Sequence, residues 1–128
     1  MSDLAKKIKL KTGLKAAVIR PPENYLQELQ HDVEISPNLR GKFDWIQIFV
    51  KNKAELDELA PKAANALKPE SIFWITFPKG SSKIQTDLTR DTGWDEIRKL
   101  DLKWINLVSI NETWSAFSML PYREGETK

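Results

Sequence analysis

The sequence predicts a three-layered α/β fold whose mostly parallel sheet ends in an antiparallel hairpin, and three observations support this prediction. Residues 43–50 and 72–77 are almost entirely apolar, which is typical of strands covered by helices on both faces. Between them, apolar residues recur at spacings of three and four, which indicates an amphipathic helix over 54–67. A strand, a helix and a strand over about 35 residues form a right-handed crossover unit. Residues 104–110 and 113–120 are joined by so short a link that only an antiparallel hairpin can form.

The first third of the chain adds two helices and two strands. A short helix near the N-terminus is expected to end at Gly13. Residues 16–19 form a short buried strand, which the two prolines that follow bring to an end because proline cannot donate to a strand ladder. The second of these prolines suits the first turn of a helix over 22–31. Alternation of polar and apolar residues over 32–36 predicts a short outer strand.

Two predicted helices later in the chain contain a residue that affects where the helix breaks or begins. Pro61 lies inside the helical pattern, where it removes a hydrogen bond and clashes with the carbonyl of Asp57, so we expect a kink or a break. Thr86 or Asp87 can cap a further helix that runs to about Lys99.

The composition restricts the classes of function. The 128 residues, 41% hydrophobic and 30% charged, fit a single domain over residues 1–128. The formal net charge is only +2, which does not indicate a nucleic-acid binder. With no cysteine and one histidine, thiolate nucleophiles and cysteine metal clusters are excluded, and we expect no metal site. Lysines interrupt the apolar residues near the N-terminus, and no apolar run approaches the roughly 20 residues of a membrane helix. We therefore expect a cytoplasmic protein that binds no membrane.

Five tryptophans in a chain of this length need an explanation. Trp45 and Trp74 lie inside the predicted central strands and are expected to pack in the core. Trp94 and Trp104 are expected either in the core or on a partner surface, since exposed tryptophan favours protein contacts. Trp114 fills the core or offers a stacking face beside Glu112.

Four segments carry a resemblance to known proteins: Phe43-Asp44, Phe77 to Lys83, Thr86 to Arg90, and Asn111 to Ser115. In their order and spacing these segments are similar to a small bacterial family of uncharacterised proteins, a domain of unknown function. Residues 43–120 also resemble the second half of a class I S-adenosylmethionine-dependent methyltransferase, in which strand, helix, strand, helix and terminal hairpin follow in this order. The resemblance implies a Rossmann-like fold over nearly the whole chain and no established activity.

The residues that a methyltransferase uses to hold its cofactor are missing. In that class the loop after the first strand is rich in glycine, because the backbone must approach the cofactor closely. Here the loop reads Arg20-Pro21-Pro22-Glu23-Asn24. An acidic residue should also end the second strand and hold the ribose, but that strand ends in Ser36-Pro37. We therefore expect a methyltransferase-like fold without the glycine-rich loop and with no cofactor.

The carboxyl ends of the strands are the expected binding site, because ligands of open α/β sheets bind there. The Gly80-Ser81-Ser82 loop can present amides and hydroxyls to an anion, with lysines on either side. The alternative is a solvated loop in which Asp87 caps a helix and pairs with Arg90. A glutamate at the hairpin bend can act as a general base or hold a ligand hydroxyl, or can be a simple turn residue. The candidate ligand-binding residues are Arg20, Lys79, Ser81, Ser82, Lys83, Asp87, Arg90 and Glu112.

Three hypotheses of function follow. The leading one is a non-enzymatic α/β module that binds a small anionic ligand or a protein partner at the carboxyl-end rim. The second is a divergent, methyltransferase-like enzyme with Glu112 or Asp87 as acid or base. The third is a structural protein that forms homo-oligomers through a hydrophobic surface.

Overall fold

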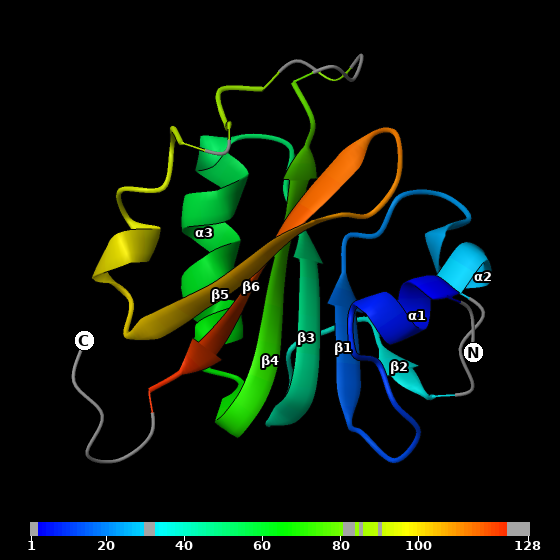
Figure 1. Ribbon diagram of the computed structural model, residues 1–128. Coiled ribbons are helices and arrows are strands. Elements are labelled where there is room, and N and C mark those ends of the chain that lie inside the picture. The colour runs from blue at the N-terminus through cyan, green and yellow to red at the C-terminus, as the bar shows by residue number, and fades with distance from the viewer. Residues whose placement is uncertain (1–2, 30–32, 81–83, 85, 90, 123–128) are drawn as a thin grey trace.

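The computed structural model describes residues 3–29, 33–80, 84, 86–89 and 91–122 (Figure 1). Its sheet has six strands in the order β2-β1-β3-β4-β6-β5. Strands β2, β1, β3 and β4 run parallel, and β6 is antiparallel to both β4 and β5. The predicted mixed α/β sheet and its C-terminal antiparallel hairpin are therefore confirmed. The strands are β1 (Ala16–Ile19), β2 (Ile35–Ser36), β3 (Phe43–Phe49), β4 (Leu67–Pro78), β5 (Leu102–Ser109) and β6 (Trp114–Pro121).

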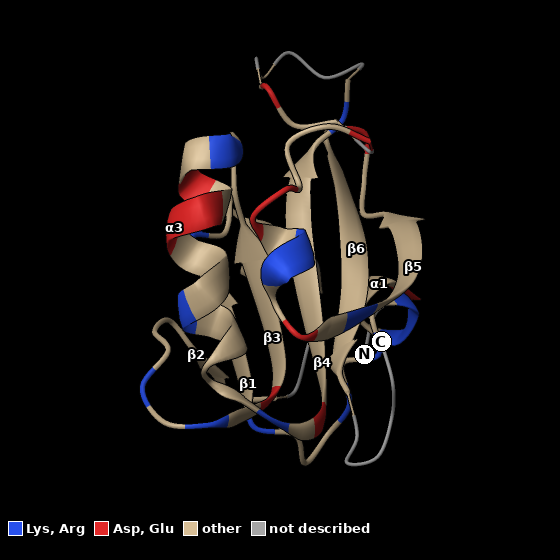
Figure 2. Ribbon diagram, turned by 90° about the vertical axis from the view of Figure 1, so that its left-hand side faces the viewer, with Lys and Arg blue, Asp and Glu red and all other residues tan. Residues whose placement is uncertain are grey.

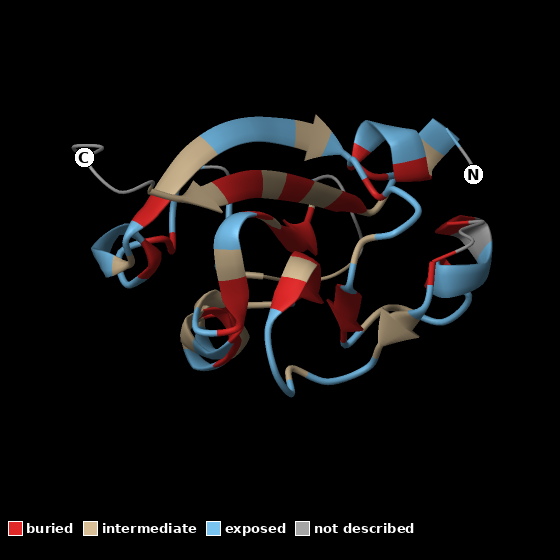
Figure 3. Cartoon of the chain, turned by 90° about the horizontal axis from the view of Figure 1, so that it is seen from below, coloured by how far each residue is buried: buried red, intermediate tan, exposed pale blue. Residues whose placement is uncertain are grey.

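Helices lie on both faces of the sheet (Figure 3). Helix α3 and the 3₁₀ helix η1 cover one face, and α1 and α2 cover the other. Every residue of β1, and every residue but one of β3, is buried, as expected for central strands between two helical layers. Among the described residues, no helix is long and apolar enough to cross a membrane. The helices are α1 (Asp3–Lys7), α2 (Tyr25–Leu29), α3 (Lys53–Ala64) and η1 (Ile97–Lys99).

The face under α3 contains an aromatic cluster. Trp94 contacts Phe77, Trp104 and Phe117 edge to face, with ring centroids 5.1 to 5.6 Å apart. Trp94 is buried and Trp104 is half-buried, so Trp94 belongs to the core and does not form a partner surface.

The opposite face is held by two tryptophans of the central strands. The indole N–H groups of Trp45 and Trp74 both donate to the carbonyl oxygen of Ile8, each at 2.8 Å. Both side chains are fully buried, which confirms the predicted core positions. Because one carbonyl accepts both bonds, the chain just after α1 is fixed against β3 and β4.

A buried polar chain explains the glutamine inside β3. The hydroxyl of Tyr25 donates to Oε1 of Gln47 at 2.8 Å, and Nε2 of Gln47 donates to Oγ1 of Thr76 at 2.9 Å. Burying a polar group lowers stability mainly when the group lacks a hydrogen-bond partner. Because each of these groups is paired, the network joins α2 to the sheet with little loss of stability.

The predicted helix from Thr86 or Asp87 to Lys99 is wrong: among its described residues, only η1 is helical. The amide of Leu88 donates to the hydroxyl of Thr86 at 3.0 Å, and the amide of Thr92 donates to that of Thr89 at 3.0 Å. Such local side-chain bonds compete with helix formation. Gly93 then has a φ of 101°, a left-handed conformation that ends any helix before η1.

Two further details differ from the prediction. Helix α3 continues without a break through Pro61 to Ala64, so the sequence does not form two short helices there. Helix α1 ends at Lys7, well before Gly13.

Candidate functional site

A cleft of about 570 Å³ lies at the carboxyl ends of β1 and β3. The loop after β1 forms one wall, the start of α3 forms another, and aromatic rings from β3 and β6 lie between them. This is the edge of the sheet at which the sequence predicted a binding site. The lining residues are Arg20, Pro21, Pro22, Glu23, Phe49, Lys51, Glu55, Ile84 and Trp114.

Arg20 lies at the mouth of the cleft in a left-handed conformation, with a φ of 59°. Its guanidinium donates to the carboxylate of Glu58 at 3.3 Å, and the two side chains are 45% and 55% exposed. An ion pair this exposed contributes about 0–1 kcal/mol, so a ligand anion can replace Glu58 at little cost.

Lys51 follows β3 and is exposed beside the cleft. No described residue forms an ion pair with its ammonium group. Its backbone amide donates to Oε1 of Glu55 at 2.9 Å, which holds that carboxylate at the start of α3. The side chain of Lys51 is therefore a cation available to a ligand.

The first amides of α3 are already occupied. The side chain of Asn52, the N-cap, accepts from the amide of Glu55 at 2.9 Å. The carboxylate of Asp87 accepts from the amide of Lys53 at 2.7 Å. Asp87 thus binds the N-terminus of α3 from a distant loop, and does not cap a helix of its own. An anionic ligand in the cleft must be held by side chains and not by these amides.

Helix α3 carries a lysine near each end and three acidic residues between them (Figure 2). The ammonium of Lys53 donates to Oδ2 of Asp57 at 2.6 Å, and this hydrogen bond raises the pKa of Lys53. Within the described part of the chain, no group of three or more histidine, aspartate or glutamate side chains could hold a metal ion.

The other sequence candidates lie outside this cleft. Lys79 follows β4, and its ammonium donates to the hydroxyl of Ser109 at 2.5 Å. Glu112 is exposed in the turn between β5 and β6. Neither residue lines the cleft. Ser81, Ser82, Lys83 and Arg90 lie outside the described residues.

Phe49 and Glu55 line the cleft but were not among the candidates that sequence reasoning named. Both lie within a few residues of the carboxyl end of β3, so position relative to the strand end was the signal that could have found them.

The lining of the cleft lacks the features by which methyltransferases of the class that the sequence resembles hold S-adenosylmethionine. Arg20 occupies a left-handed position, where a glycine would leave room for a cofactor. Pro21 and Pro22, which line the cleft, have no amide N–H to donate to a ligand. Strand β2 ends at Ser36, whose hydroxyl donates to the carbonyl of Asn38 at 2.9 Å, and neither Ser36 nor the Pro37 and Asn38 that follow carries a carboxylate to bind a ribose.

Solved structures similar to this one include several methyltransferases. TehB from Haemophilus influenzae matches with a TM-score of 0.55 and 9% identity, over 94% of this chain and 62% of TehB. Ribosomal protein L11 methylase from Lactobacillus delbrueckii subsp. bulgaricus has a TM-score of 0.57 and 9% identity, over 93% of this chain and 76% of the methylase.

An S-adenosylmethionine-dependent methyltransferase from Clostridium acetobutylicum matches with a TM-score of 0.53 and 8% identity, over 82% of this chain and 74% of the enzyme. No family model and no curated protein matches the sequence. At these identities the likeness establishes the fold alone. The chain has the Rossmann-like fold of the class I S-adenosylmethionine-dependent methyltransferases, as the resemblance in its sequence implied.

Proposed function

We propose that this protein is a non-enzymatic α/β module that binds a small anionic ligand in the carboxyl-end cleft. The observation that carries the proposal is the Lys51 ammonium, an exposed cation without an ion-pair partner among the described residues, at the rim of a cleft of about 570 Å³. Ligand pockets of this kind measure about 300–1,000 Å³, and in open α/β sheets they lie at the carboxyl ends of the strands.

The lining of the cleft indicates the class of ligand. Lys51 and Arg20 supply two cations at the rim, and the second is held only by a weak exposed ion pair. Phe49 and Trp114 add aromatic surface to the lining. Glu23 and Glu55 contribute carboxylates, which disfavour a ligand that spreads negative charge over the whole cleft. A compact anionic group joined to a planar or apolar part, as in a nucleoside monophosphate, suits this arrangement.

A divergent methyltransferase is the second candidate, and the likeness of the fold to S-adenosylmethionine-dependent enzymes favours it. Under this alternative the cleft binds the adenosyl cofactor in spite of Arg20 and the two prolines. The two candidate functions therefore differ in the ligand that the carboxyl-end cleft binds, a small anion or S-adenosylmethionine.

Isothermal titration calorimetry with adenosine 5′-monophosphate, inorganic phosphate and S-adenosylmethionine separates the candidates. We expect adenosine 5′-monophosphate to bind the native protein and Lys51→Gln to weaken it about tenfold, the usual loss for a hydrogen bond to a charged group. Lys6→Gln, which removes an exposed lysine from α1, is the matched control and should change nothing. The proposal would be overturned if neither adenosine 5′-monophosphate nor inorganic phosphate gave heat at millimolar concentration. It would also be overturned if Lys51→Gln and Lys6→Gln weakened the binding of adenosine 5′-monophosphate equally. Binding of S-adenosylmethionine alone would establish the second candidate.

A further inference from the structure

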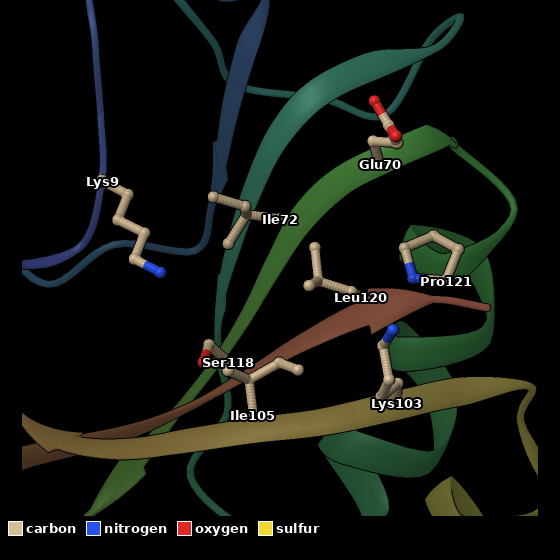
Figure 4. A pocket seen from close by; sticks show the side chains of 8 residues that line it. All are labelled: Lys9, Glu70, Ile72, Lys103, Ile105, Ser118, Leu120 and Pro121. Carbon is tan, nitrogen blue, oxygen red and sulfur yellow. The ribbon is translucent and has the colours of Figure 1, made fainter. Parts of the chain in front are cut away.

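A second hollow lies at the opposite end of the sheet from the cleft. It is a groove of about 320 Å³ across β4, β6 and β5, on the same face as α1 (Figure 4). Its floor consists of Ile72, Ile105 and Leu120, one from each strand. Ile105 is 41% exposed, which makes it the most exposed large hydrophobic side chain among the described residues. The remaining lining residues are Lys9, Glu70, Lys103, Ser118 and Pro121.

Lys9 is placed beside this groove by the end of α1. The amide of Lys9 donates to the carbonyl of Lys6 at 3.1 Å, and that of Leu10 donates to the carbonyl of Ala5 at 2.9 Å. This pair of bonds is a Schellman cap, in which Lys9, with a φ of 62°, occupies the left-handed position usually held by glycine. The preceding carbonyl, that of Ile8, accepts both buried indoles, so the backbone that carries Lys9 is fixed.

The charged side chains are arranged asymmetrically around the apolar floor. In Figure 4 the ammonium of Lys9 points toward the groove, and that of Lys103 lies beside Leu120. The carboxylate of Glu70 points away from the floor. No described residue forms an ion pair with Lys9. The groove therefore combines exposed apolar surface with positive charge directed toward it.

We infer that this groove binds an amphipathic anion, an aliphatic carboxylate of medium chain length. The alkyl chain lies on Ile72, Ile105 and Leu120 and removes their exposed surface from water. The carboxylate lies near Lys9 and Lys103, where a charge-assisted hydrogen bond can form. A small inorganic anion lacks the alkyl chain, and a neutral alcohol lacks the charge, so each makes only part of these contacts. The inference does not depend on the proposed function, because the two sites share no lining residue.

The chain-length dependence of binding tests the apolar floor. We would titrate the protein with hexanoate, octanoate and decanoate below the concentrations at which they form micelles, and follow ¹H–¹⁵N chemical shifts. Each added methylene that becomes buried should tighten binding about three- to fourfold. Shift changes should centre on Ile105 and Leu120. Binding that does not strengthen with chain length, or shifts that map to another surface, would contradict the inference.

Variants test the charge. Lys9→Gly removes the ammonium and suits the left-handed backbone, so the fold is retained, and we expect octanoate binding to weaken at least fivefold. Lys51→Gln, in the carboxyl-end cleft, should leave octanoate binding unchanged, which separates failure of this inference from failure of the proposed function. Equal affinity for 1-octanol and octanoate would overturn the inference. Binding to anionic lipid vesicles without binding to the free carboxylates would also overturn it, and would indicate a membrane-surface site instead.

Discussion

Substitutions at Arg20 separate the strain of its left-handed backbone from the ion pair that its side chain makes. Arg20→Gly and Arg20→Ala both lose the guanidinium and its bond to Glu58, so the difference between them reports the backbone alone. A left-handed conformation lowers the unfolding free energy by about 1–2 kcal/mol for a residue with a Cβ. Glycine avoids this strain, but its more flexible unfolded chain lowers the unfolding free energy by about 0.4–1 kcal/mol. We therefore expect Arg20→Gly to be more stable than Arg20→Ala by about 0.5–1 kcal/mol.

Urea denaturation measures this difference. With an m-value of about 1.5–2 kcal/mol/M, the midpoint of Arg20→Gly should lie about 0.25–0.7 M above that of Arg20→Ala. Lys62 provides the matched control, because it lies in the regular helix α3 and is exposed. At this position Lys62→Gly should be less stable than Lys62→Ala, since glycine in a helix costs about 0.5–1 kcal/mol relative to alanine. An Arg20→Ala variant as stable as Arg20→Gly, with the normal order at Lys62, would refute the assignment of strain to Arg20.

Three further predictions concern stability. Asp87→Ala removes the acceptor for the amide of Lys53 at the start of α3 and should cost about 1 kcal/mol in urea denaturation, whereas Asp87→Asn, which keeps an acceptor oxygen, should cost less. The amide of Lys15 donates to Asp44 at 2.8 Å and lowers the pKa of that carboxyl below 3.8, so Asp44 contributes stability above that pH and loses it as the pH falls through the lowered pKa. The stability difference between the native protein and Asp44→Asn should therefore shrink between about pH 5 and pH 2, and a constant difference would count against this reasoning. Lys9→Gly should raise the unfolding free energy by about 0.5–1 kcal/mol, because glycine occupies the cap of α1 without strain; a loss of stability would show that the side chain is needed there.

The parts of the fold that the sequence predicts are those determined by local pattern. Residues 43–50 and 72–77 are apolar on both faces, and β3 and the buried part of β4 follow them closely. The hairpin followed from the short link between residues 110 and 113. In these cases burial on both faces, or the length of a link, leaves the chain no other arrangement.

The parts that sequence reasoning missed depend on contacts between distant segments. The spacing of Leu88, Trp94 and Ile97 suits one helix, and all three are buried. Only Ile97 lies in a helical turn, that of η1, because the hydroxyls of Thr86 and Thr89 accept local amide bonds in the segment before it. Asp87 binds the amide of Lys53, which lies 34 residues earlier in the sequence, and no local pattern predicts that partner. A general rule of α/β folds pointed to the end of the sheet at which the cleft lies, but the lining of the cleft depends on which face each side chain occupies.

The tryptophans fall into two groups that the sheet separates. Trp45, Trp74 and Trp114 belong to the face that carries α1, and Trp94 and Trp104 belong to the face that carries α3. Each group is a natural fluorophore for its own side of the molecule. Replacing one group with phenylalanine leaves an emission signal that follows a single helical layer during denaturation. Coincident transitions for the two signals would mean that both layers come apart in one cooperative event, with the sheet as the shared element that couples them.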